Sequence, residues 1–330
     1  MKPRALVPVT LSAALLITAC SSPDSATPEA PESSAGETQP AADGAVSLTH
    51  PSIEGLEIAF DAQPQTLVMD CYAYSSFSDY DLQPAALFGF DCENPNVMGD
   101  ADISGIEFVG KDGEINMEKL AELRPDAIIG NGGAEGWSWF DEDVNGQLLR
   151  VAPFVPLPSG GTVDENIANT RSVAEFLGGD TESEAIAAAD EEFAAAKEAF
   201  SAAAEGKDLN FMLASPVKEM LYSGVGFAQA DLLEELGANI VGAPKPEQGN
   251  PWGQIAWEEA STYPTDVFLI EGYNADNPEE AFTTELWEDL PAVRAGQISV
   301  WYSKGEMTSR SYAAWLNTVA ELTSNAQKVS

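Results

Sequence analysis

The sequence has one histidine, three cysteines and few basic residues, and each shortage excludes a class of function. A lone histidine, His50, argues against Ser–His–Asp or Cys–His catalysis and against a histidine-rich zinc, copper or manganese site. With 15 basic and 54 acidic residues, the formal net charge is −39. Such a chain repels nucleic acid and anionic lipid headgroups, and it offers few cations to a strongly anionic ligand. We therefore expect no nucleic-acid partner, no cofactor and no metal site, and a solvated His50.

Long apolar runs are also missing, apart from one at the start of the chain. Lys2 and Arg4 precede an uncharged, mostly apolar stretch at 6–19, the layout of a secretory signal peptide, expected over 1–19. This stretch is shorter than the about 20 apolar residues that span a bilayer. It ends Ile17-Thr18-Ala19-Cys20, which resembles the lipobox of bacterial lipoproteins, where the cysteine receives acyl chains such as palmitate. An ordinary signal peptide with an incidental Cys20 is the alternative.

The next segment has the composition of a tether. Residues 21–45 are rich in Ser, Pro, Ala and Thr, and contain five acidic, no basic and no aromatic residues. Such a segment cannot bury enough apolar surface to fold. We expect a lipidated Cys20 and a disordered acidic tether over 20–50, which together hold a folded body at the extracytoplasmic face of the cell membrane.

Two cysteines remain once Cys20 is assigned to the lipid. Cys71 and Cys92 form a pair in an exported protein, which favours a disulfide. Closing a loop of about 20 residues stabilises the fold by about 3 kcal/mol in the chain-entropy model. A metal site of two thiols needs further Cys or His residues nearby, and the sequence has none there.

The rest of the chain alternates short apolar runs with helical patterns, which predicts an α/β fold. We expect two Rossmann-like lobes with mainly parallel sheets, over 51–180 and 206–330, joined by one long helix at 181–205. A Thr181/Glu184 capping box is predicted to start this helix. The other predicted helices lie at 118–123, 164–177, 228–236, 257–262 and 309–325, and the strands at 66–69, 86–90, 127–130, 149–156, 210–214, 240–241, 267–270 and 298–301.

The two halves repeat one local pattern. Residues 117–129 and 256–269 each run from a short acidic helix through a proline stop and an aspartate to an apolar strand. The repeat supports two lobes of similar construction.

Aromatic residues follow several of the predicted strands. Ligands of open α/β sheets bind beyond the carboxyl ends of the strands, and large rings offer broad apolar contact there. The predicted sheets therefore favour an aromatic cleft between the lobes, although any one ring can instead pack in the core, and Arg310 can form a surface ion pair. The candidates are Tyr72, Tyr74, Trp137, Trp139, Tyr222, Tyr273, Trp301, Tyr302 and Arg310.

Two weaker motifs carry no site. Asp141 to Gly146 fits the start of a calcium loop, but position twelve is Ala152 where a glutamate is needed, so a polar helix start is the better interpretation. Gly224-Val225-Gly226 lacks the third glycine of a dinucleotide loop.

Several segments between about 55 and 325 form a recognisable set. They are 113–120 with Leu123-Arg124-Pro125-Asp126-Ala127-Ile128-Ile129, the helix at 181–204, Leu232 to Gly237, and Asn250-Pro251-Trp252 with Trp257-Glu258-Glu259. By these residues the region resembles the bacterial solute-binding proteins for ferric siderophores and vitamin B12, which serve ABC importers. The resemblance implies two lobes joined by a rigid helix, transporter docking by Glu135 and Glu258, and ligand contacts by Trp252 and Arg310.

The resemblance implies a monomer with a small-molecule ligand, ABC permease subunits as partners and the membrane as anchor. The shortage of Arg and Lys favours a ferric hydroxamate over a catecholate. Haem, bound by a tyrosine ligand to iron, and cobalamin are the alternatives. A secreted two-lobe enzyme and a purely interacting surface protein stay open, since fold alone does not fix function.

Overall fold

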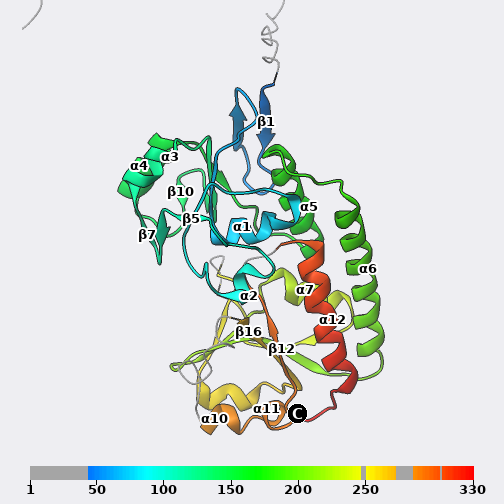
Figure 1. Cartoon of the computed structure of the whole chain (residues 1–330). Helices are drawn as coiled ribbons and strands as arrows, with labels where there is room; N and C mark the ends of the chain where they lie inside the picture. The colour runs from blue at the N-terminus through cyan, green and yellow to red at the C-terminus, as the bar shows by residue number, and fades with distance from the viewer. Residues whose placement is uncertain (1–43, 247–249, 273–284, 305–306) are drawn as a thin grey trace, which may run out of the picture. The chain divides into compact units, whose positions relative to one another are not determined.

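The computed structural model describes residues 44–246, 250–272, 285–304 and 307–330, and residues 41–330 form one compact unit (Figure 1). The predicted signal peptide, Cys20 and Tyr273 lie outside the described residues. No helix of the described ranges is long and apolar enough to cross a membrane.

The first lobe is built on a five-stranded sheet whose strands are all parallel, in the order β11-β8-β3-β4-β5. Every residue of β3, β4, β8 and β11 is buried, because helices cover both faces of a parallel sheet. The strands are β3 (Leu67–Asp70), β4 (Ala86–Phe88), β5 (Glu107–Phe108), β8 (Ala127–Gly130) and β11 (Phe154–Pro156).

Small hairpins accompany this sheet, each a two-stranded antiparallel pair. They are β1 (Val46–Thr49) with β2 (Glu57–Phe60), β6 (Gly110–Lys111) with β7 (Glu114–Ile115), and β9 (Gly132–Gly133) with β10 (Gly136–Trp137).

The second lobe holds a mixed sheet of six strands. Its path runs β15-β13-β12-β16-β17, with β14 also paired to β12. Strands β14, β16 and β17 join in parallel, whereas β13 and β15 are antiparallel. The strands are β12 (Asn210–Pro216), β13 (Leu221–Ser223), β14 (Asn239–Ile240), β15 (Gly253–Ile255), β16 (Val267–Glu271) and β17 (Ile298–Trp301). The prediction of an α/β fold with mainly parallel sheets is confirmed.

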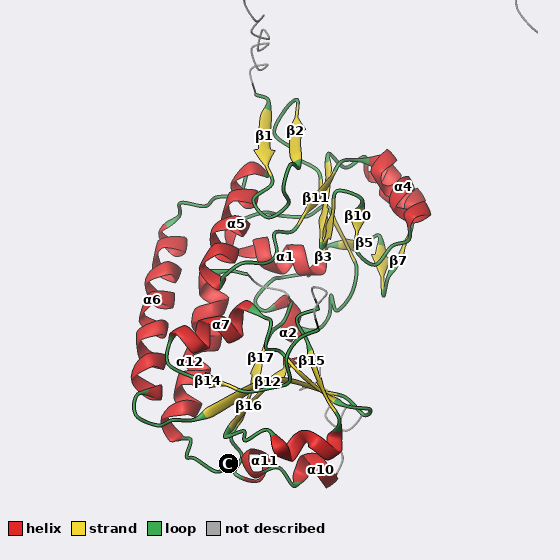
Figure 2. Cartoon of the chain, turned by 180° about the vertical axis from the view of Figure 1, so that it is seen from behind, coloured by secondary structure: helices red, strands yellow, loops and turns green. Residues whose placement is uncertain are grey.

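One long helix, α6 (Glu184–Ala204), leads from the first lobe to the second and lies beside α12 (Ser309–Asn325) in both views (Figures 1 and 2). The predicted start at Thr181 is wrong, because the Ser183 side chain accepts the N–H of Ile186 and caps the helix. The other helices are α1 (Cys71–Phe77), η1 (Ser78–Tyr80), α2 (Pro95–Met98), α3 (Met117–Leu123), α4 (Glu142–Val151), α5 (Val163–Phe176), α7 (Ala228–Glu235), η2 (Trp257–Thr262), α10 (Glu285–Glu288) and α11 (Pro291–Arg294).

The pattern repeated in the two halves is a strand clamp. Asp126 precedes β8, and its side chain accepts the N–H groups of Gln65 and Thr66 at 2.9 and 2.8 Å, just before β3. Asp266 precedes β16, and its side chain accepts the N–H of Asn210 at the start of β12. Each aspartate therefore fixes the register of two neighbouring parallel strands.

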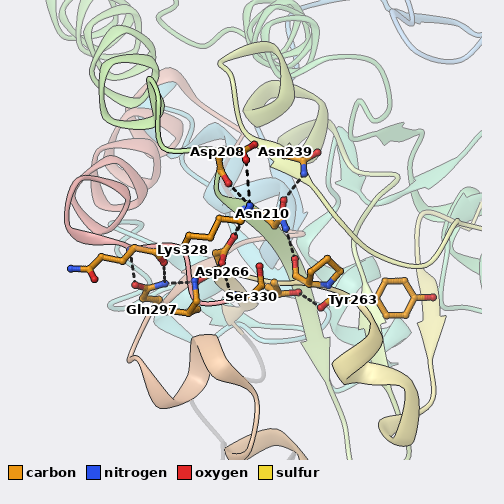
Figure 3. A network of polar contacts seen from close by, with 12 residues as sticks. Asp208, Asn210, Asn239, Tyr263, Asp266, Gln297, Lys328 and Ser330 are labelled. Atoms are coloured by element: carbon orange, nitrogen blue, oxygen red, sulfur yellow. Dashed lines mark hydrogen bonds and ion pairs between the residues drawn. The ribbon is translucent and has the colours of Figure 1, made fainter.

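In the second lobe this clamp also holds the chain's C-terminal residues (Figure 3). The fully buried Asp266 accepts the N–H groups of Val329 and Ser330 at 2.7 and 2.8 Å. Gln297 donates to the Gln327 carbonyl and accepts its N–H. The end of the chain is thus bonded to the start of the central strands.

Two further local predictions need correction. His50 is 3% exposed rather than solvated, because the β1–β2 hairpin carries it against the first lobe, where Nε2 lies 3.0 Å from the Pro156 carbonyl. Burial lowers its pKa. The predicted strand at 149–156 begins as the end of α4, and only Phe154–Pro156 is extended. The polar helix start is confirmed, since Asp141 caps α4 by accepting the N–H of Val144.

Candidate functional site

The first lobe carries a cluster of aromatic rings at the carboxyl edge of its sheet. Trp137 lies at its centre, with ring centroids 4.9 Å from Trp139, 5.4 Å from Phe88 and 5.5 Å from Phe90. Tyr72 joins through Trp139 at 5.9 Å. Three of the predicted site residues are therefore brought together from two segments, Tyr72 from one and Trp137 with Trp139 from the other.

Asp70 fixes this cluster to the sheet. It ends β3, is fully buried, and its Oδ2 accepts the Trp137 indole N–H and the Asn131 N–H, both at 2.7 Å. Its Oδ1 accepts the N–H of Ala73 and caps α1. Burial raises the pKa of Asp70 to about 6, against the lowering effect of these bonds. Gly130 permits the packing, because a Cβ there would lie 2.9 Å from Asp70 Oδ2.

Tyr72 and Asp91 form the edge of the cluster that faces the second lobe. The Tyr72 hydroxyl donates to Asp91 Oδ2 at 2.7 Å. The disulfide between Cys71 and Cys92 joins the neighbours of these two residues, with 5.2 Å between the Cα atoms. The predicted disulfide is thus present in the structure, and it holds the Tyr72–Asp91 pair in place.

The second lobe carries its own aromatic cluster. Trp252 contacts Tyr222, Phe227 and Trp301, with centroids 6.2, 4.7 and 5.6 Å away. Trp301 is fully buried and donates its indole N–H to the Ala214 carbonyl. Gly224 allows this packing, since a Cβ there would lie 3.0 Å from the Trp301 ring. That close approach gives the Gly224-Val225-Gly226 segment a structural role.

Two cavities of about 250 and 240 Å³ lie beside this second cluster and share Lys304. The cavity of about 250 Å³ lies within the second lobe and is lined by Ser215, Val217, Tyr222, Trp252, Glu271, Ser303 and Lys304. The cavity of about 240 Å³ is lined by residues of both lobes, those of the first lobe coming from around α2. They are Pro95, Asn96, Gly99, Asp100, Gln229, Val300, Tyr302, Lys304, Arg310, Ser311, Tyr312, Ala314, Trp315 and Thr318.

Contacts around these cavities join the two lobes. The Lys304 ammonium lies 5.7 Å from the centroid of the Tyr72 ring. The Asn96 side chain donates to the Gly272 carbonyl at 3.3 Å. The two cavities and the Tyr72 edge of the first cluster therefore form one candidate site between the lobes.

Arg310 has a second role besides lining a cavity. Its Nε donates to Asp79 Oδ1 at 2.9 Å, and Asp79 belongs to η1 of the first lobe. Next to it, Ser309 donates to Asp190 of α6, which also accepts from Arg171 of α5 at 2.7 Å. The start of α12 is thus bonded to η1 and α6 at the joint of the lobes, and Asp190 links it to α5.

Several predicted ligand contacts are packed in the cores. Trp137 and Trp301 are 1% and 0% exposed, and Tyr74 is buried with its hydroxyl on the Asp102 carbonyl. The structure places these three as supports rather than as cavity walls, because each fills the space between its sheet and the adjoining segments. Tyr222, Trp252, Tyr302 and Arg310 line the cavities.

Sequence reasoning missed several residues of the site. Lys304, Glu271 and Asn96 lack a distinctive motif, and only their positions after β17, at the end of β16 and at the start of α2 could have indicated them. Asp91 has a left-handed backbone with φ of 57°, which the sequence does not announce.

The two predicted docking glutamates lie on different lobes. Glu135 is exposed between β9 and β10 of the first lobe, and Glu258 is exposed in η2 of the second. Both carboxylates can therefore be reached by a partner. Within the described residues, no group of three or more His, Cys, Asp or Glu side chains is arranged to hold a metal ion.

The fold and the site agree with a sequence comparison. The profile of the periplasmic binding protein family matches residues 98–304, more than half of the chain. The chain belongs to the periplasmic binding protein family. Proteins of this family are substrate-binding transport proteins, and they bind their substrates outside the cytoplasm. No curated protein sequence matches the chain.

Solved structures with this fold include three periplasmic binding proteins of siderophores. DesE, a ferric-siderophore receptor protein from Streptomyces coelicolor, has 22% identity and a TM-score of 0.74, covering 86% of this chain and 100% of DesE. The siderophore periplasmic binding protein from the fuscachelin gene cluster of Thermobifida fusca has 24% identity and a TM-score of 0.60, covering 80% and 98%. FeuA from Bacillus subtilis, complexed with ferri-bacillibactin, has 18% identity and a TM-score of 0.61, covering 84% and 99%.

Proposed function

We propose that this periplasmic binding protein is the substrate-binding component of an ABC importer and captures a ferric siderophore between its lobes. The observation that carries the proposal is a cavity of the second lobe walled by the rings of Tyr222 and Trp252, which shares Lys304 with a second cavity that residues of both lobes line. Large rings suit a bulky, partly apolar complex. The similar structures named above support the ligand class.

Charge favours a hydroxamate complex over a catecholate. A ferric tris-catecholate is strongly anionic and needs several cations around it. Lys304 and Arg310 are the basic residues among those that line the two cavities, and Arg310 is paired with Asp79. Because FeuA carries a tris-catecholate ligand on the same fold, the fold alone does not decide the class.

Capture and delivery require no bond-making step. The one histidine, His50, is buried against Pro156 in the first lobe and is not among the residues that line the cavities. We assign it a structural role and propose no catalytic activity.

The remaining parts of the proposal concern the membrane. Cleavage before Cys20 and acylation of its thiol would anchor the protein at the extracytoplasmic face, and two acyl chains make a stable anchor. Glu135 and Glu258 would dock the two lobes onto basic pockets of the permease subunits, since each carboxylate is exposed. We expect the protein to act as a monomer.

A fluorescence titration tests the ligand. The chain from residue 20 onward, with Cys20→Ser to prevent acylation, is titrated with a ferric tris-hydroxamate, a ferric tris-catecholate, haem and cobalamin. Trp252 reports binding, because it lines a cavity of the site. Saturable quenching by the hydroxamate complex supports the proposal. Quenching by haem or cobalamin alone would identify that compound as the ligand in place of a siderophore. Absence of quenching by all four compounds would refute uptake of these compounds.

A further inference from the structure

The cavity of about 240 Å³ that residues of both lobes line, here called the interlobe cavity, differs in charge from the rest of the molecule. The whole chain has 54 acidic and 15 basic residues. The wall of the interlobe cavity carries two cations, Lys304 and Arg310, against one carboxylate, Asp100. Basic residues therefore outnumber acidic ones here, which reverses the balance of the chain. A local excess of positive charge on so acidic a protein favours a negatively charged group of the ligand.

The guanidinium group of Arg310 has one of its two hydrogen-bonding edges occupied. Its Nε donates to Asp79 Oδ1 at 2.9 Å, while the Arg310 side chain stays 45% exposed. Its Nη groups make no hydrogen bond or ion pair within the described residues. Two Nη groups side by side match the two oxygens of a carboxylate. The bond to Asp79 thus orients Arg310 and leaves this pair of donors to a ligand.

Lys304 supplies the second cation. Its side chain is exposed and lines both cavities of the site. The ammonium group lies 5.7 Å from the centre of the Tyr72 ring, and it makes no ion pair or hydrogen bond in the part of the chain that the structure describes. Glu271, the carboxylate of the other cavity, instead accepts the Ser303 hydroxyl at 2.9 Å. The charge of Lys304 is therefore available to a ligand in either cavity.

The size of the interlobe cavity fits one arm of a ligand rather than a whole ferric complex. Pockets for entire small molecules span about 300–1,000 Å³, which is more than the volume of about 240 Å³ found here. Part of the wall is apolar, made by Pro95, Val300, Ala314 and Trp315. A short methylene chain that ends in a charged group matches both kinds of wall.

We propose that the ferric complex carries an arm that ends in a carboxylate, that the interlobe cavity receives this arm, and that Lys304 and Arg310 bind the carboxylate. The inference rests on the proposed function and deepens it, since it names the charge of the ligand. It also agrees with the shortage of basic residues. One carboxylate on a neutral hydroxamate core needs two cations, whereas a tris-catecholate core needs several more.

Three ferric complexes that differ only at one end test the proposal by calorimetric titration. Ferric desferrioxamine B ends in an ammonium group, its N-acetyl derivative in a neutral amide, and its N-succinyl derivative in a carboxylate. The formal net charge of the protein, −39, attracts the ammonium form and repels the succinyl form. The proposed site predicts the reverse order, with affinity for the succinyl form about tenfold above that for the acetyl form.

Lys304→Met and Arg310→Gln each remove one cation from the interlobe cavity. In both variants the preference for the succinyl form should fall to about twofold or less, because the carboxylate loses a charged partner. Binding of the acetyl form should stay as in the wild-type protein, which shows that the fold is intact.

Two further variants are controls. Asp79→Asn breaks the ion pair of Arg310 and keeps both cations of the cavity, so the preference should persist. Arg150→Gln removes a positive charge from the end of α4 in the first lobe, where Arg150 is exposed, and should also leave the preference unchanged.

Each outcome decides the matter. Equal affinity of the wild-type protein for all three probes, or the order that net charge predicts, overturns the carboxylate site and leaves hydroxamate capture standing. This result needs no variant and so holds even where a variant does not fold. A preference that survives in Lys304→Met and Arg310→Gln, or that Asp79→Asn also abolishes, overturns direct binding by these two cations. Failure of all three probes to bind the wild-type protein refutes hydroxamate capture, and the carboxylate site with it.

Discussion

Asp70 should make the stability of the protein depend on pH in an unusual direction. Its carboxyl group is fully buried, and burial raises its pKa to about 6. A carboxyl whose folded pKa is raised binds its proton more readily in the folded protein than in the unfolded chain. Its contribution to stability is therefore complete below pH 4 and is lost as the pH rises through 6. Moving the pKa from its ordinary value near 4 to about 6 corresponds to about 3 kcal/mol.

The assay compares the wild-type protein with Asp70→Asn by urea unfolding between pH 4 and 7.5. The absolute stabilities will differ, because an asparagine cannot accept from Ala73, Asn131 and Trp137 in the same way. The informative quantity is the change of this difference with pH, expected to be about 3 kcal/mol in the direction given. Parallel curves for the two proteins would refute the reasoning.

Asp126→Asn is the matched control with the opposite sign. The N–H groups of Thr66 and Gln65 lower the pKa of Asp126. Its contribution to stability is therefore present above the ordinary carboxyl pKa and is lost as the pH falls below it. The difference between wild type and Asp126→Asn should shrink toward acidic pH.

Three further predictions concern the crosslink, the cleft and docking. Replacing Cys71 and Cys92 by serine should lower the free energy of unfolding by about 3 kcal/mol, as measured by urea unfolding. It should also weaken ligand binding, because the disulfide no longer holds Tyr72 and Asp91 in place. Unchanged binding would contradict this positioning role. Trp252→Ala should weaken binding of a ferric hydroxamate about tenfold or more in titrations, since a large ring leaves the cavity wall; unaltered affinity would remove Trp252 from the site. Alanine at Glu135 and Glu258 should abolish uptake by cells and leave binding in solution intact; normal uptake would exclude docking by these carboxylates.

Much of the fold could be predicted from apolar segments that follow turn residues, because such segments form buried strands. The segments at 127–130, 267–270 and 298–301 are apolar and follow turn residues, and all three are strands. The aspartates before two of these strands are the clamps that hold neighbouring strands together, which is why the pattern recurs.

Other elements could not be predicted because their signals are weak or depend on tertiary contacts. Helix α1 over Cys71–Phe77 starts directly after β3, and only the capping carboxylate of Asp70 marks the boundary. The β1–β2 hairpin follows a segment of tether composition, so burial of His50 could not be read from its neighbours.

The candidate site shows the same division. The position of rings after strands predicted an aromatic cleft between the lobes, which stays a prediction, and it did not tell which rings line a cavity. Trp301 fills the core because Gly224 admits it, whereas Trp252 in the same cluster reaches the cavity. Lys304 and Asp91 depend on the approach of two lobes and on a strained backbone, neither of which a local pattern encodes.

Calorimetric titration of the Cys20→Ser chain with ferric desferrioxamine B tests the central claim most directly. We predict one complex bound per protein molecule with saturable heat, and a marked loss of affinity when Trp252 is replaced by alanine. Absence of saturable binding, or binding indifferent to Trp252 and to Tyr72→Ala, would contradict capture of a ferric siderophore between the lobes.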